Sequence, residues 1–335
     1  MRAIIPERYG RGILRALVLS NMLPDRAHPE RGRFVRDQVR ALRALGGADV
    51  ELHEFPPGPG ALARAARDLR RSHGGPSVMS SRPAAAPIDV VHAHFGLTAW
   101  PALAVPGRVR ALTMHGTDLS HPRTRLATAL VLPLMDLPAV VSESLLADVP
   151  GARARRRAQV LPCGVDTGRF SPMARRDARA ELGLDPGRPV LLFPADPSRP
   201  EKRHDRAAEV AALTGAHLLT LGGVDPERVP LLVNASNAVL VPSEREGFGL
   251  AVLEALACDV PVIATPVGIH REALAGVAGA VCAPFDAGVW ADFARHMVDA
   301  EDPRIDGTAA AERYSAAVMA GRVMHAWEHA VQQSG

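Results

Sequence analysis

Lysine is almost absent from this 335-residue chain: of its 39 Lys and Arg residues, every one except Lys202 is arginine. Aromatic side chains are also scarce, at 4%, which argues against a single-strand nucleic-acid binder that stacks bases on aromatic rings. The formal net charge is only +3, although the isoelectric point is about 9.1. We interpret the arginine bias as a coding preference, which makes the single lysine conspicuous.

Cysteines are few, and long apolar runs are missing. The three cysteines, Cys163, Cys258 and Cys282, are isolated and lack the C-x-x-C spacing of a zinc site or a disulfide framework. Near the N-terminus, residues 13–20 are apolar but short and interrupted by Arg15, which predicts a buried strand and not a signal peptide. No run reaches the ~20 apolar residues that span a bilayer. We therefore expect a cytoplasmic protein, with at most peripheral contact at the inner face of a membrane.

Strand-like apolar runs alternate with helix-like stretches along the whole chain, a pattern typical of parallel sheets with crossover helices. The length favours two domains over one. We expect a first Rossmann-like domain over 1–165, a second over 166–315, and a last helix over 316–335 that packs back on the first; the helical pattern itself begins near residue 303. Strands are predicted at 14–19, 50–55, 88–93, 109–114, 139–141, 159–161, 190–193, 217–221, 238–241, 262–264 and 280–282.

The most informative segment is 242–268, PSEREGFGLAVLEALACDVPVIATPVG. A predicted strand ends at Val241, and a glycine-containing loop leads from it into a helix predicted over 250–257. Glycine lets backbone N–H groups approach a ligand closely, and a helix N-terminus favours a phosphate. Glu246 precedes the helix and Glu254 lies one turn inside it, and carboxylates commonly accept ribose hydroxyls in nucleotide sites. Taken alone, two glutamates eight residues apart could equally be solvated helix charges.

The complete string PSxxEGFGLxxLEAxAxxxPVIAT resembles the family 4 glycosyltransferases, whose hallmark is two glutamates separated by seven residues. The resemblance implies the GT-B fold, an α/β architecture of two Rossmann-like α/β/α domains with a cleft between them. It also implies that Glu254 binds the donor ribose and that Glu246 contacts the transferred sugar. The segment Gly247, Phe248, Gly249 and Leu250 would contact sugar or diphosphate through backbone amides.

A second segment, FPADPSRPEKR, follows a predicted strand and contains Arg199 and Lys202. Two cations three residues apart could clamp a diphosphate leaving group, where negative charge develops during transfer. An ordinary basic loop is the alternative interpretation. In the family that this chain resembles, an Arg and a Lys at this place contact the donor phosphates, which favours the first interpretation and implies no metal. The chain also lacks the Asp-x-Asp motif that holds a metal in other glycosyltransferases.

In the first half, His115-Gly116-Thr117-Asp118 follows a predicted strand and resembles the family's H-G-x-D element. The resemblance implies that His115 approaches the transferred sugar and that Asp118 helps to build the loop. Gly32 occupies the region where the family has a glycine-rich turn, and we assign it with His115 and Asp118 to the acceptor side. His92 and His94 share one face of a strand, but no third metal ligand accompanies them, so we interpret them as packing residues.

We therefore predict a retaining, metal-independent transferase, of hexosyltransferase type, that needs no cofactor beyond a UDP- or GDP-sugar. The acceptor would be a hydroxyl group of a saccharide, a lipid-linked molecule or a small molecule, in cell-envelope polysaccharide, glycolipid or secondary-metabolite synthesis. One alternative is a nucleotide-sugar 2-epimerase of the same architecture. Another is a nucleic-acid or membrane-surface binder, because residues 153–157 read RARRR; we expect no nucleic-acid partner, since a short basic run is usually a solvated face.

Overall fold

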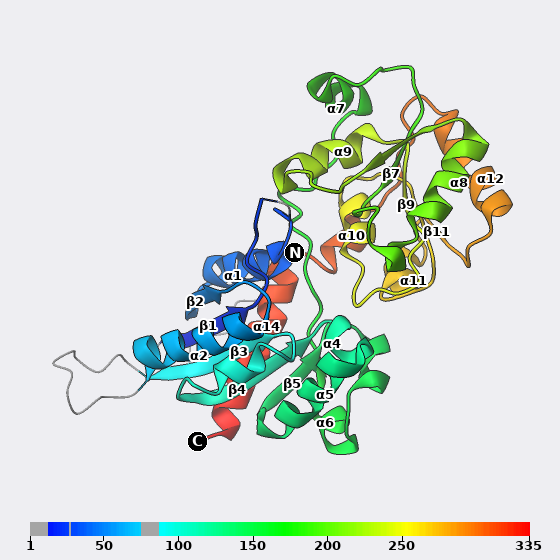
Figure 1. The fold of residues 1–335 in the computed structure, drawn as a ribbon. Helices are drawn as coiled ribbons and strands as arrows, with labels where there is room; N and C mark the ends of the chain where they lie inside the picture. Colours follow the sequence, from blue (N-terminus) through cyan, green and yellow to red (C-terminus); the bar gives the residue numbers. More distant parts are fainter. Residues whose placement is uncertain (1–12, 27, 75–86) are drawn as a thin grey trace.

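Two parallel β-sheets organise the chain, each covered by helices on both faces (Figure 1). The computed structural model describes residues 13–26, 28–74 and 87–335. The first sheet has the order β2-β1-β3-β4-β5-β6 and the second the order β11-β10-β9-β7-β8. All the strand pairs are parallel. We call the two sheets with their helices the first and second domains.

The eleven predicted strands are present in the described ranges, with ends shifted by at most three residues. In the first domain they are β1 Leu14–Ser20, β2 Ala48–Glu54, β3 Ile88–His94, β4 Gly107–Met114, β5 Leu137–Val140 and β6 Gln159–Val160. In the second they are β7 Val190–Phe193, β8 His217–Thr220, β9 Ala238–Val241, β10 Val262–Ala264 and β11 Val281–Cys282.

Helices connect these strands. Those of the first domain are α1 Arg33–Leu45, α2 Pro59–His73, α3 Ala99–Ala102, α4 Thr117–Ser120, α5 Pro122–Val131 and α6 Ala152–Arg157, with 3-10 turns η1 Leu132–Leu134 and η2 Glu143–Asp148. The others are α7 Arg175–Leu182, α8 His204–Thr214, α9 Val229–Ala235, α10 Leu250–Ala257, α11 His270–Leu274, α12 Ala287–Val298, α13 Thr308–Glu312 and α14 Ala316–Gln333, with η3 Pro200–Lys202 and η4 Pro226–Arg228. None of the helices in the described ranges is long and apolar enough to cross a membrane.

The last helix, α14, lies against the first domain, although the chain reaches it from the second (Figure 1). Its residues Met319, Val323 and Trp327 are spaced by one helical turn and are all buried. They pack with Val35 and Val39 of α1 in one apolar cluster on one face of the first sheet. The chain is thereby tied across the domain boundary at a second place, besides the linker that follows β6.

The prediction of a single final helix from about residue 303 is wrong in its first part. Residues 303–307 are not helical, and α13 and α14 are separate helices. The reason is local: the backbone N–H groups of Ile305 and Gly307 donate to the backbone oxygen and side chain of Asp259. Ser315 then caps α14, because its hydroxyl accepts the N–H of Val318. These bonds take backbone groups that a continuous helix would need.

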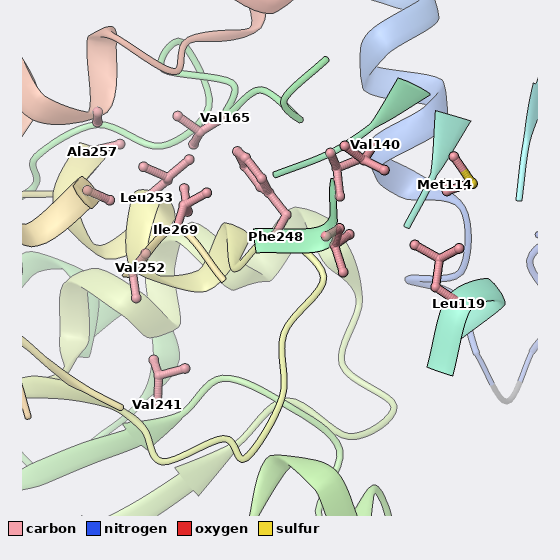
Figure 2. Packing of buried hydrophobic residues seen from close by; sticks show 14 of the residues in the cluster. Met114, Leu119, Val140, Val165, Val241, Phe248, Val252, Leu253, Ala257 and Ile269 are labelled. Atoms are coloured by element: carbon pink, nitrogen blue, oxygen red, sulfur yellow. The ribbon is translucent and has the colours of Figure 1, made fainter. Parts of the chain in front are cut away.

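The largest apolar cluster crosses between the domains. It contains Met114 and Val140 from the first sheet, and Leu253 and Ile269 from the second domain. Figure 2 shows Phe248 at this crossing, between the second-domain residues and Val140. The Phe248 side chain is 6% exposed, so the two domains share apolar surface beside the loops that follow their strands.

Trp327→Ala is expected to lower the free energy of unfolding by about 3–5 kcal/mol, since it empties a fully buried aromatic site. It also removes the indole N–H that donates to His92 Nδ1 at 3.1 Å. Chemical denaturation measures the change. The exposed residue Glu328 on the same helix provides the control, because Glu328→Ala should alter the free energy by less than about 0.5 kcal/mol. Equal effects of the two variants would contradict the packing of Trp327 between α14 and the first sheet.

Candidate active site

An ion pair near the start of α10 joins Glu246, in the loop after β9, to Lys202 at the end of η3. Lys202 Nζ lies 2.6 and 2.7 Å from the two carboxylate oxygens of Glu246, and the Ser243 hydroxyl donates to the same carboxylate at 2.8 Å. Both charged side chains are largely buried. Burial alone would raise the pKa of Glu246, but the Lys202 ammonium outweighs it and holds that pKa below its ordinary value. Glu246 is therefore a carboxylate anchored to the only lysine in the chain.

Glu254 lies on α10 and is partly buried. Burial raises the pKa of its carboxyl to about 7, with the Arg169 guanidinium opposing and Asp37 reinforcing the shift. Among the described residues, none makes a hydrogen bond to this carboxyl group. Asp37 belongs to α1 of the first domain, so Glu254 faces the boundary between the domains. A half-neutral carboxyl group with free hydrogen-bonding capacity is suited to paired hydroxyl groups of a ligand.

The loop after β4 is built around the buried carboxylate of Asp118. This carboxylate accepts the backbone N–H groups of His115 and Gly116, both at 2.9 Å, and of Gly96 at 3.2 Å. Burial raises the pKa of Asp118 to about 6, although these three N–H groups act to lower it. Asp118 thus holds the loop that presents the imidazole of His115, and its own side chain is directed inward.

His115 is neutral and closely packed. Its ring centroid lies 4.9 Å from that of Phe34 and 4.5 Å from that of Phe95. Burial, with a smaller Coulombic contribution from His92, lowers the pKa of His115 to about 3. His115 Nε2 is hydrogen-bonded to His94 Nδ1 at 2.9 Å. With both rings neutral, one nitrogen of the pair donates and the other accepts, so His94 fixes the orientation of His115 and the tautomers of the two rings are coupled.

The two strand-following loops meet directly. A Cβ atom added at Gly247 would lie 1.9 Å from the backbone oxygen of His115, and one added at Gly116 would lie 3.1 Å from Gly247 Cα. The Ser142 hydroxyl, after β5, donates to the backbone oxygen of Gly247 at 2.7 Å. Only glycine allows this approach without displacing backbone. The structure therefore brings His115 and Glu246, which are 131 positions apart in the sequence, to the same junction.

Some predicted site residues lie elsewhere than expected. The Arg199 side chain is 51% exposed and forms an ion pair with Glu201 at 2.7 Å, not a pair with a group of the Lys202–Glu246 cluster. The Phe248 side chain belongs to the apolar core, so only its backbone could contact a ligand. Gly32 precedes α1 with φ 69°, where a Cβ atom would lie 2.4 Å from the Met22 backbone oxygen. Glycine is therefore required at this position by the backbone conformation and by the close approach of Met22.

Gly249 and Leu250 form the start of α10. Gly249 has φ 112°, and a Cβ atom there would lie 2.4 Å from His270 Nε2. His270 is fully buried, and its Nε2 has no hydrogen-bond partner among the described residues. The same α10 N-terminus leaves backbone N–H groups directed out of the helix.

Sequence reasoning missed Ser142, Ser243 and His270 and interpreted His94 only as a packing residue, although all four side chains support the site. Three of them lie at or just after the carboxyl end of a parallel strand, where α/β proteins place their ligands, and this position is the signal that could have found them. His270 follows β10 by a longer loop, so its contact with Gly249 depends on the tertiary fold. Among the described residues, no cluster of three His, Cys, Asp or Glu side chains could hold a metal ion.

Comparisons with known proteins identify related sequences for both domains. Residues 29–169 match the family described as Glycosyltransferase Family 4, and residues 196–312 match Glycosyl transferases group 1. D-inositol 3-phosphate glycosyltransferase of Mycolicibacterium smegmatis is 34% identical over 179 residues, which are 44% of this chain and 41% of that protein. The protein of the same name from Actinosynnema mirum is 30% identical over 261 residues, 61% of this chain and 62% of that one. The matched part is thus about half the length of these relatives.

Solved structures share the arrangement of both domains. Sucrose-phosphate synthase from Thermosynechococcus elongatus superposes with a TM-score of 0.68 at 19% identity, over 94% of this chain and 98% of that one. Anabaena HepE, solved in complex with UDP and glucose, gives 0.67 at 16% identity, over 94% and 100%. The expected GT-B fold is confirmed.

Glu254→Gln should change how the free energy of unfolding depends on pH. Because the pKa of Glu254 is about 7 in the folded protein and near its ordinary value when unfolded, the unfolded state loses its proton first. The stabilisation from the neutral carboxyl is therefore complete below about pH 4.5 and is lost as the pH rises through about 7. The variant should gain stability relative to wild type over this interval, by about 3 kcal/mol at most.

Denaturation of both proteins at pH 4.5 and pH 8 measures this gain. Glu209→Gln, on the exposed side of α8, is the matched control and should show no pH-dependent difference. A constant difference between wild type and Glu254→Gln across the interval would refute the raised pKa.

Proposed function

We propose that this chain, which belongs to the family 4 glycosyltransferases (glycosyl transferases group 1), transfers a hexosyl group from a nucleoside-diphosphate sugar to a hydroxyl acceptor with retention of anomeric configuration. The observation that carries the proposal is the buried Lys202–Glu246 ion pair at the N-terminus of α10, directly opposite the His115 loop. UDP- and GDP-sugars are the proposed donors, and the uridine donor has the support that HepE, a relative in fold, was solved with UDP and glucose.

The donor diphosphate would bind at the start of α10. The helix N-terminus offers free backbone N–H groups, and the Lys202 ammonium lies beside it in its ion pair with Glu246. Arg199 is exposed next to this place and would leave Glu201 to contact the phosphates. These protein groups supply the positive charge that a departing diphosphate requires, and so we propose a metal-independent reaction.

The two glutamates would bind the other two parts of the donor, the ribose and the transferred sugar. Glu254, with a carboxyl group that no described residue binds, would take the ribose hydroxyls. Glu246 is held by Lys202 and Ser243 with both oxygens engaged. This anchoring favours a role in binding a sugar hydroxyl over nucleophilic attack, because a nucleophilic carboxylate needs a free oxygen directed at the anomeric carbon.

On the acceptor side, His115 would contact the transferred sugar, with Asp118 holding its loop and Gly32 shaping the start of α1. In the proposed step the bond between the anomeric carbon and the diphosphate oxygen breaks, and the acceptor oxygen bonds to that carbon on the same face. The acceptor proton passes to the departing phosphate. Such a step needs orientation and charge stabilisation but no protein nucleophile, which agrees with neutral His115 and anchored Glu246.

The alternatives receive less support. A 2-epimerase would need no acceptor, and the family matches in both domains favour a transferase. A nucleic-acid binder would leave the buried acidic residues Glu246 and Glu254 without a role, because phosphate backbones are bound by cations. We place the enzyme in a reducing cytoplasmic compartment, in line with three cysteines that form no disulfide.

Nucleoside-diphosphate release from UDP-, GDP- and ADP-sugars tests the activity. Wild type should slowly hydrolyse one donor, and this should persist in EDTA. Lys202→Ala should lower kcat by about 10²–10³-fold, the usual effect of removing one charge-stabilising group. Glu254→Ala should weaken nucleotide affinity by about ten- to 100-fold, the loss expected when a pair of hydrogen bonds to ribose hydroxyls is removed.

Glu209→Ala is the matched control and should leave kcat and affinity unchanged, since Glu209 is exposed on α8. Thermal unfolding of each variant separates loss of function from loss of fold. If no donor is turned over and no nucleotide raises the unfolding temperature of wild type, the chain is not a nucleotide-sugar transferase. NMR assignment of the product anomer tests retention separately.

A further inference from the structure

An apolar stripe lies exposed on the first domain. Leu126 and Leu130 on α5 and Leu134 at the end of η1 are 63%, 60% and 52% exposed. Leu126 and Leu130 are four residues apart, the spacing that places two side chains on one side of an α-helix, and Leu134 follows in the adjoining 3-10 turn. Trp100 on α3 is 40% exposed and adjoins them, because its indole N–H donates to the Ala127 backbone oxygen of α5. We call these four residues the leucine stripe.

Arginine is the main charged residue near the leucine stripe. Between residues 121 and 136 the charged side chains are Arg123, Arg125 and the exposed Asp136. The arginines of α6 join them, since Arg157 Nη2 donates to the Asp136 backbone oxygen at 2.6 Å, just beyond η1. Figure 1 draws α5 and α6 together beside β5. Arg153 and Arg156, on the same short helix as Arg157, are exposed, so positive charge lies next to the bulky apolar side chains.

We propose that this surface rests on an anionic lipid bilayer. Exposed leucines insert at the boundary between headgroups and acyl chains, tryptophan favours the interface, and arginine binds anionic headgroups. A nucleic acid would use the arginines but leave the leucines in water. A symmetric contact with a second copy would bury the leucines, yet it would bring the same arginines face to face, which is unfavourable.

The docking surface is connected to the acceptor side of the candidate active site. Helices α4 and α5 follow directly after the His115 loop, and the Thr128 hydroxyl of α5 is 3.3 Å from the Asp118 backbone oxygen. Bilayer contact through α5 would therefore bring the His115 loop close to the membrane surface. Given the proposed function, this indicates a lipid-linked hydroxyl acceptor; the docking itself does not depend on that function.

Tryptophan fluorescence provides a direct probe. Of the three tryptophans, Trp290 and Trp327 are fully buried and Trp100 is exposed. Adding vesicles that contain phosphatidylglycerol to the full chain should shift the emission to shorter wavelength and carry the protein down in co-sedimentation. Vesicles of pure phosphatidylcholine should bind at least tenfold more weakly, and added salt should weaken binding to the anionic vesicles.

Two variants test which residues make the contact. The double substitution Leu126→Ser with Leu130→Ser, and separately Arg153→Glu with Arg156→Glu, should each reduce the partition onto anionic vesicles at least tenfold. Leu213→Ser is the matched control, because Leu213 is 47% exposed but lies on α8 of the second domain, and it should bind as wild type does. Thermal unfolding confirms that the variants remain folded.

Several results would overturn the proposal. These are no binding to anionic vesicles at low salt, equal loss of binding with Leu213→Ser, and salt-dependent DNA binding in place of vesicle binding. A dimer in sedimentation velocity that the leucine substitutions dissociate would assign the surface to a second copy of the chain. Vesicle binding without any nucleoside-diphosphate release would support the docking surface while the proposed enzymatic function fails, so the two are tested separately.

Discussion

The contact between two backbone segments, His115–Gly116 in the first domain and Gly247 in the second, is the constraint on which the site depends. Each segment follows a parallel strand at its carboxyl end, and parallel strands direct all their following loops to one edge of the sheet. Because the two edges face each other, the glycines come within reach of the opposite backbone. A side chain at Gly247 would separate the two loops and, with them, the His115 and Glu246 side chains.

The same junction explains why charged groups can be buried there. Lys202 and Glu246 neutralise each other, and Ser243 occupies a further acceptor position of the carboxylate, as buried charges require. His94 and His115 lie in a similarly enclosed place but remain neutral, since burial lowers both of their pKa values. The site thus presents one anchored ion pair, one neutral imidazole and one carboxyl group with a raised pKa, Glu254. The charge state of each group is set by its burial and by the groups that contact it.

The first domain combines this site with two other surfaces. One face of its sheet is covered by α1 and α14, with Trp327 buried against His92. On the other side, α5 carries exposed leucines and is attached through Thr128 to the loop that holds His115. A short path of covalent and hydrogen bonds therefore links the surface proposed for the bilayer to the residue proposed to contact sugar. The second domain supplies the groups proposed for the donor.

The local sequence pattern was sufficient to predict the strands, their alternation with helices and the family of this protein. Strands and crossover helices repeat along the chain because apolar periodicity and glycine positions are local properties, and the string from Pro242 to Gly268 identified the family. Glu246, Lys202 and His115 could be named in advance because each lies in a recognisable segment. What the sequence could not provide was the direction of side chains. Arg199 turns to Glu201, Phe248 turns into the core, and Asp259 interrupts the final helix through bonds to Ile305 and Gly307. Those outcomes, like the pKa of Glu254, depend on which distant groups come into contact, and only the packing of the two domains decides that.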